Sequence, residues 1–149
     1  MNKAKNDAPA GHPPAVILAG DFNAEPMSEA YELLTQGRID SARMATLSQN
    51  ANGNSVRLPF AQPSNVVDGA ALELRTAHQA QGVEEPRFTN YTEGFKGCLD
   101  YITFQPGSLR CVAVGELPSE AALKQDVALP NAEQPSDHLP VVCRLEFVD

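Results

Sequence analysis

The chain contains no tryptophan, no excess of positive charge and no hydrophobic run of membrane-spanning length. Its 149 residues include 11 basic and 19 acidic side chains, which gives a formal net charge of −8. This charge argues against a protein whose affinity for nucleic acid comes from a broad cationic face. It does not exclude chemistry on phosphate, because a carboxylate-rich site accepts phosphate once a divalent cation is bound there.

Disulfide frameworks and zinc sites are also disfavoured. The three cysteines, Cys98, Cys111 and Cys143, are odd in number and show no C-x-x-C spacing, which favours a reducing, intracellular compartment. Residues 1–14 are polar, with neither a hydrophobic signal core nor an Arg-rich amphipathic pattern, and we expect them to form a flexible arm. No association with a membrane is predicted.

Residues 15–149 are predicted to form one domain of strands and short helices. Residues 15–19 are a continuous apolar run, typical of a strand buried on both faces. Ser28 can cap a short amphipathic helix that ends at Gly37. Further strands are predicted at 87–92, 99–104, 109–117 and 141–147, helices at 70–80 and 119–124, a turn at 93–97 and a long loop at 47–69. This order favours a layered α/β (α+β) architecture.

A first polar cluster, Gly20-Asp21-Phe22-Asn23, follows the first strand. Residues i and i+2 of an extended chain point the same way, so Asp21 and Asn23 can face one pocket. A carboxylate beside an amide offers oxygen ligands for a hard cation and a donor for a phosphate oxygen. The alternative is a polar turn in which both side chains bond the local backbone.

Two further clusters follow, at Leu99–Ile102 and at Ser136-Asp137-His138. A Ser-His-Asp hydrolase triad is excluded for Ser136-Asp137-His138, because adjacent residues point in different directions. We expect His138 to bond a distant carboxylate instead, with Asp100 the obvious candidate, which favours the protonated imidazole beside a phosphate. The alternatives are an exposed Asp at a strand end and a surface turn around His138.

Taken together and in this order, GDFN, LDYI and SDH before a final apolar strand resemble the carboxyl-terminal half of the endonuclease/exonuclease/phosphatase superfamily. The stretches GDFNAEP, FTNYTEGFKGCLDYITF and LPNAEQPSDHLPVVCRLEF are similar to the branch that contains the Ccr4-type deadenylases, nocturnin, the angel proteins and the 2′,5′-phosphodiesterases. The resemblance covers almost the whole chain, from about residue 15 to residue 147.

The resemblance implies half of a four-layer α-β-β-α sandwich over residues 15–149, with a mixed β-sheet and helices on one face. In this family an amino-terminal half supplies a metal-binding Glu and an Asn near the phosphate. We find no counterpart of either in this sequence, and expect the chain alone to be inactive. A sheet face left exposed by such a half is expected to form a homodimer.

Site roles also follow from the resemblance. Asp21 is expected to position or activate the attacking water near the metal, and Asn23 to hold phosphate oxygens and join the metal shell. Asp100 is expected to orient His138, which contacts the scissile phosphate, while Asp137 lies beside the metal. Phe95 matches a position that stacks on a substrate base. A core Phe beneath a turn is the alternative for this residue.

The resemblance therefore predicts a Mg²⁺-dependent phosphodiesterase or 3′-exoribonuclease, with Mn²⁺ as an alternative metal. Its partner is expected to be the 3′ end of single-stranded RNA, either poly(A) or 2′,5′-linked oligoadenylate, in the cytoplasm or in mitochondria. The second hypothesis is a non-catalytic half-domain that binds RNA or protein and works through association.

Overall fold

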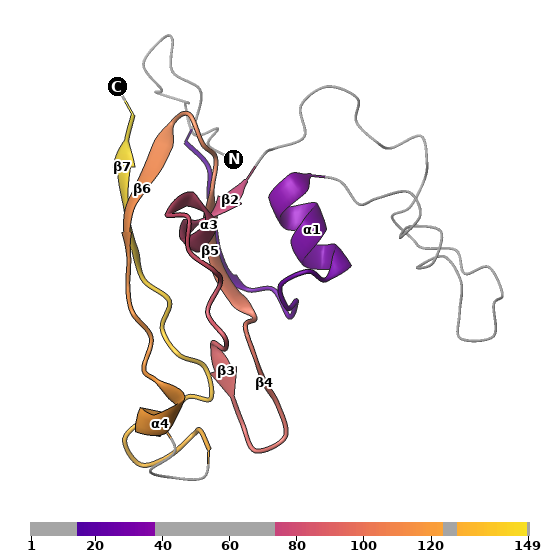
Figure 1. Cartoon of the computed structure of the whole chain (residues 1–149), viewed down its shortest axis with the longest axis vertical. Helices are drawn as coiled ribbons and strands as arrows, with labels where there is room; N and C mark the ends of the chain where they lie inside the picture. The colour runs from indigo at the N-terminus through magenta and orange to yellow at the C-terminus, as the bar shows by residue number, and fades with distance from the viewer. Residues whose placement is uncertain (1–14, 38–73, 124–127, 149) are drawn as a thin grey trace, which may run out of the picture.

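The computed structural model describes residues 15–37, 74–123 and 128–148 (Figure 1). The described residues form both helices and strands, in agreement with the predicted α/β (α+β) class. In chain order they are β1 (Ile17–Asp21), α1 (Glu29–Gln36), β2 (Arg75–Thr76), α3 (Ala77–Ala80), β3 (Asn90–Tyr91), β4 (Lys96–Gly97), β5 (Asp100–Phe104), β6 (Leu109–Val114), α4 (Glu120–Leu123) and β7 (Cys143–Phe147). The predicted loop at 47–69 lies outside the described residues.

The central sheet has the strand order β1-β5-β2. Its strands are antiparallel, with Ile17 opposite Phe104 and Asp21 opposite Asp100. The ladders β3–β4 and β6–β7 are antiparallel as well, so the predicted mixed sheet is not found among the strands of the described ranges. The four-layer sandwich with helices on one face stays a prediction.

Three small clusters of buried side chains hold these elements together. One joins α3 to β5 and β6 through Ala77, Phe104, Leu109 and Cys111. A second surrounds β3 and α4 and contains Phe88, Tyr91, Leu123, Leu129 and Leu139. The third joins α1 to β5 through Tyr31, Cys98 and Tyr101, with Phe22 packed against it. Within the described ranges, no helix has the length and hydropathy of a membrane span.

Helix α1 forms as its sequence predicts. The Ser28 hydroxyl accepts a hydrogen bond from the Tyr31 backbone at 3.3 Å, and Gly37 ends the helix in the left-handed conformation that glycine adopts without strain. The Tyr31 ring packs on Tyr101 of β5, with ring centroids 5.2 Å apart. Phe22 packs against the same tyrosine, so the loop after β1 and the helix share one anchor on the sheet.

A buried polar network ties α1 to β2 and α3. The Tyr31 hydroxyl donates to Glu85 Oε1 at 2.9 Å and accepts from the Gln79 amide at 2.7 Å. The Thr76 hydroxyl donates to the same Glu85 oxygen. Burial and the neighbouring Glu85 carboxylate raise the pKa of Tyr31, so its hydroxyl stays protonated and available as a donor. The predicted helix at 70–80 is partly wrong, because residues 75–76 pair with β5 instead.

Another departure concerns the hairpin that follows. The sequence predicts a turn over 93–97, whereas Lys96 and Gly97 form β4 and pair with β3. The turn is tighter, and the Thr92 hydroxyl closes it through bonds to the Phe95 backbone at 2.9 and 3.1 Å. This geometry places Phe95 outside the hairpin core, and the residue is 40% exposed.

Strand β1 is exposed along its whole length, so the prediction of a strand buried on both faces is wrong for the described structure. Ile17 is 53% exposed and Leu18 is 44% exposed. The physical reason is that β1 is an edge strand paired only with β5, and none of the three buried clusters includes one of its residues. An apolar strand in this position offers an association surface.

We expect the chain to self-associate through the exposed face of β1 as a two-fold pair of sheets. Burying roughly 400 Å² of apolar surface per chain contributes about 10 kcal/mol at about 25 cal/mol per Å². Sedimentation at micromolar concentration should show a dimer, and Leu18→Glu should shift it toward the 16.0 kDa monomer. Val83→Glu, at a residue 48% exposed beyond α3, is the matched control. A clean wild-type monomer would contradict the paired-sheet prediction.

Candidate active site

Backbone pairing brings the three polar clusters to one end of the central sheet. Asp21 ends β1 directly opposite Asp100 at the start of β5, and the Phe22 amide extends the ladder by donating to the Leu99 carbonyl at 2.9 Å. The third cluster joins them through an isolated bridge between Asn90 and His138. Segments more than a hundred residues apart in the sequence therefore contribute to one site.

The predicted hydrogen bond between Asp100 and His138 is present. His138 Nδ1 lies 2.8 Å from Asp100 Oδ2, and the two side chains are 30% and 18% exposed. This bond is the main cause that raises the pKa of His138 above its usual 6.5, and the charges of Asp137 and Asp21 add to it. The imidazole is thus biased toward its protonated form, with Nε2 left over for a ligand.

Thr89 is a part of this arrangement that the sequence interpretation missed. It is 0% exposed, and its hydroxyl oxygen accepts from the backbone amides of Leu99 and Asp100 at 2.9 and 3.0 Å. Its proton is therefore directed to Asp100 Oδ2, 2.6 Å away. Thr89 fixes the carboxylate that orients His138. A polar residue within the predicted strand at 87–92 was the available signal, because a hydroxyl requires a partner once it is buried.

Asp21 and Asn23 form a tight turn that holds the first cluster. Asp21 Oδ1 accepts from the Asn23 backbone amide at 2.8 Å, and Oδ2 lies 3.3 Å from the Asn23 side-chain nitrogen. Asn23 adopts a left-handed φ of 48°, which asparagine tolerates better than most residues. The turn interpretation is thus correct as geometry. Asp21 nevertheless remains part of the site, because its charge contributes to the raised pKa of His138.

Asp137 is held by Asn90, whose side-chain nitrogen donates to Asp137 Oδ2 at 3.1 Å. Asn90 is only 5% exposed, so this carboxylate is oriented from within the protein. Together with Asp21 and Asn23 it supplies oxygen donors, the type that Mg²⁺ and Mn²⁺ prefer. The donor type fits a hard divalent cation, although the described residues contain no group of three or more His, Cys, Asp or Glu suited to a metal ion.

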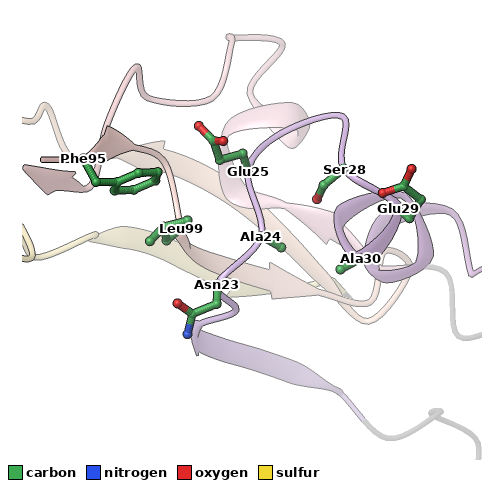
Figure 2. A pocket seen from close by; sticks show the side chains of 8 residues that line it. All are labelled: Asn23, Ala24, Glu25, Ser28, Glu29, Ala30, Phe95 and Leu99. Carbon is green, nitrogen blue, oxygen red and sulfur yellow. The ribbon is translucent and has the colours of Figure 1, made fainter. Parts of the chain in front are cut away.

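Phe95 lines a pocket of about 480 Å³ that also contains Asn23 in its wall. Its 40% exposure rules out the alternative of a core residue beneath the turn. Figure 2 shows the ring at one side of the pocket, with Asn23 below it and the start of α1 on the far side. The pocket is lined by Asn23, Ala24, Glu25, Ser28, Glu29, Ala30, Phe95 and Leu99. An aromatic wall next to the polar cluster suits a nucleobase next to its phosphate.

Comparison with known sequences gives a consistent assignment. A sequence model described as the Endonuclease/Exonuclease/phosphatase family matches residues 3–138. Human 2′,5′-phosphodiesterase 12 is 34% identical over 132 residues, 89% of this chain and 19% of that protein. The Saccharomyces cerevisiae CCR4-Not complex 3′-5′-exoribonuclease subunit Ccr4 is 34% identical over 134 residues, 89% of this chain and 14% of that protein. The chain thus spans about a fifth or less of these relatives.

Solved structures show the same fold. The crystal structure of ANGEL2, described as a 2′,3′-cyclic phosphatase, superposes with a TM-score of 0.58 at 22% identity, over 88% of this chain and 44% of that one. The human Nocturnin catalytic domain superposes with a TM-score of 0.50 at 24% identity, over 90% of this chain and 33% of that one. Because the family match extends over most of the sequence and the fold agrees with it, the chain belongs to the endonuclease/exonuclease/phosphatase family.

Proposed function

We propose that the protein is a metal-dependent phosphodiesterase that acts on RNA, and that this chain carries its Asp100–His138 dyad and part of its metal site. The observation that supports this best is the 2.8 Å bond between the two side chains, set beside Asp21 at the end of one sheet. An imidazole whose pKa is raised, next to carboxylate and amide oxygens, suits phosphoryl chemistry.

The residues divide the work of hydrolysis by their positions. His138 Nε2 donates to an oxygen of the scissile phosphate and stabilises the charge that develops there. Asp21 accepts the proton of the attacking water or holds that water in line. Asn23 binds the phosphate oxygens, and Asp137 with Asp21 would hold the cation. A bound Mg²⁺ or Mn²⁺ supplies Lewis-acid polarisation of the phosphoryl oxygen and stabilises the leaving oxygen.

The proposed substrate is the 3′ end of single-stranded RNA, as poly(A) or 2′,5′-linked oligoadenylate. The names of the relatives support this choice, since they describe a 2′,5′-phosphodiesterase and a 3′-5′-exoribonuclease. Phe95 provides the aromatic surface on which a base stacks, an interaction worth about 1–3 kcal/mol per base. The negative net charge of the chain is then tolerable, because stacking and the cation supply the affinity.

A second candidate is a non-catalytic half-domain that binds RNA or protein. The exposure of Ile17 and Leu18 on β1 favours it, since that surface suits association. The small number of metal donors among the described residues favours it too. Activity separates the candidates: the enzyme predicts turnover once its metal site is complete, and the binding module predicts none.

The dyad generates a prediction about proton affinity. In the wild type, the His138 pKa should lie above 6.5, and Asp100→Asn should lower it toward that value, because the main cause of the rise is the Asp100 bond. The sign follows from a raised pKa: the imidazolium is favoured below it and lost as pH rises through it. Titration of the histidine ring signals by NMR measures both values. An unchanged pKa in Asp100→Asn would show that the bond does not set the charge.

Thr89 generates a prediction about stability. Thr89→Val keeps the shape but leaves two backbone amides and Asp100 Oδ2 without their hydroxyl partner, and should cost roughly 2–4 kcal/mol of unfolding free energy. Thr89→Ser retains the hydroxyl and should cost less than about 1.5 kcal/mol. Urea unfolding compares the three proteins. The second measurement is the His138 pKa in Thr89→Val. It should differ from the wild-type value if Thr89 orients Asp100, and it should stay unchanged if Thr89 has only a structural role.

The metal donors generate a prediction about activity. Two carboxylates and one amide form a weak Mg²⁺ site, so the purified 149-residue chain should hydrolyse poly(A) very slowly at millimolar Mg²⁺. Calorimetric titration with Mn²⁺ should show weak binding that Asp21→Asn abolishes and Glu93→Gln leaves intact. Rapid trimming of poly(A) by the wild type, abolished in Asp21→Ala, would show that no further ligand is needed.

A further inference from the structure

The pocket beside Asn23 contains a carboxylate that the proposed chemistry does not use. Glu25 lines this pocket together with Phe95, and its side chain is exposed. Among the residues that the structure describes, none forms a hydrogen bond with the Glu25 carboxylate. Its negative charge is unfavourable for binding the phosphates of RNA, so a different role in the pocket has to account for its position.

The loop that carries Glu25 is fixed at both ends. The Tyr101 hydroxyl, buried in the sheet, donates to the Ala24 carbonyl at 2.7 Å. The Ser28 backbone amide donates to the Glu25 carbonyl at 3.1 Å, which closes the turn before α1. Ala24 itself is only 5% exposed. The position of Glu25 along the pocket wall is therefore set by the core and not by solvent.

Glu25 and Phe95 meet over Gly97. A Cβ added to this glycine would lie 2.7 Å from Glu25 Oε1 and 2.7 Å from Phe95 Cζ, so glycine provides the space that both side chains occupy. The carboxylate and the aromatic ring therefore approach the same glycine and lie close to each other in the wall of the pocket. Figure 2 shows the carboxylate turned toward the side of the pocket where the ring lies.

We infer that Glu25 selects the base that stacks on Phe95, by accepting a hydrogen bond from an exocyclic amino group. A base that stacks on Phe95 brings its substituents within reach of the neighbouring Glu25 carboxylate. A carboxylate only accepts, so it binds an amine and repels a carbonyl oxygen at the same place. Stacking alone tolerates any base, so the preference has to come from such an edge contact. The inference rests on the proposed function and adds base selectivity: adenine is preferred to a base without the amine.

The test compares two RNA tetramers bound by the purified chain, tetra-adenylate and the same tetramer with purine in place of adenine. Purine keeps the stacking surface and lacks only the amino group. Calorimetry or NMR titration should give about tenfold weaker binding of the purine tetramer to the wild type, the discrimination expected for a hydrogen bond to a charged acceptor. Glu25→Ala should bind both tetramers with equal affinity, and Glu25→Gln should retain a reduced preference.

Glu93→Ala is the matched control, because it removes the same charge from the exposed hairpin turn next to Phe95, outside this pocket. It should keep the wild-type preference. Equal binding of both tetramers by the wild type, or a preference that survives in Glu25→Ala, would overturn the role of Glu25 and leave the proposed function standing. Failure of the wild type to bind either tetramer would overturn both.

Discussion

The Oδ2 atom of Asp100 accepts two hydrogen bonds, one from Thr89 and one from His138, and the rest of the site depends on this shared acceptor. Asp100 also opens β5 and pairs with Asp21 at the end of β1. One residue thus joins the central sheet, the β3 hairpin and the segment before β7. A carboxylate in this position is tolerated at 18% exposure because both donors are already provided by the protein.

The direction of each hydrogen bond follows from burial. The Thr89 hydroxyl accepts from the backbone amides of Leu99 and Asp100 at the start of β5, so its proton can be donated only to Asp100 Oδ2. That bond orients the Asp100 carboxylate, whose Oδ2 atom also receives His138 Nδ1. The imidazole then has a defined orientation before any substrate arrives, with Nε2 facing away from the dyad. Preorganisation of this kind is what electrostatic stabilisation of a transition state requires, because no reorientation has to occur during the reaction.

The sequence predicted what depends on local pattern and missed what depends on neighbours. Asp100 and His138 could be paired because each is an ionisable group at a strand end that needs a partner. Thr89 gave only a weak signal, since a threonine in a strand is ordinary until its surroundings are known. The exposure of Leu18 could not be predicted either, because an apolar run shows that a strand can be buried and does not show what covers it. Phe95 stood between two interpretations until the tight hairpin turn decided the exposure of its ring.

The acidic character of the site becomes consistent when each carboxylate is considered with its partner. Asp100 is neutralised by His138 and Thr89, Asp137 is held by Asn90, and Asp21 is held by the turn that it forms with Asn23. In the proposed mechanism a cation and the His138 imidazolium compensate the charge of these three, so an anionic phosphate can approach. Glu25 and Glu29 line the pocket beside the aromatic ring, where the proposal places a base and not a phosphate. The proposed roles therefore separate the negative charge along the site: the acids near His138 belong to a phosphate-binding end, and Glu25 near Phe95 belongs to a base-binding end. Under this proposal, a formal net charge of −8 does not prevent the chain from recognising an anionic polymer.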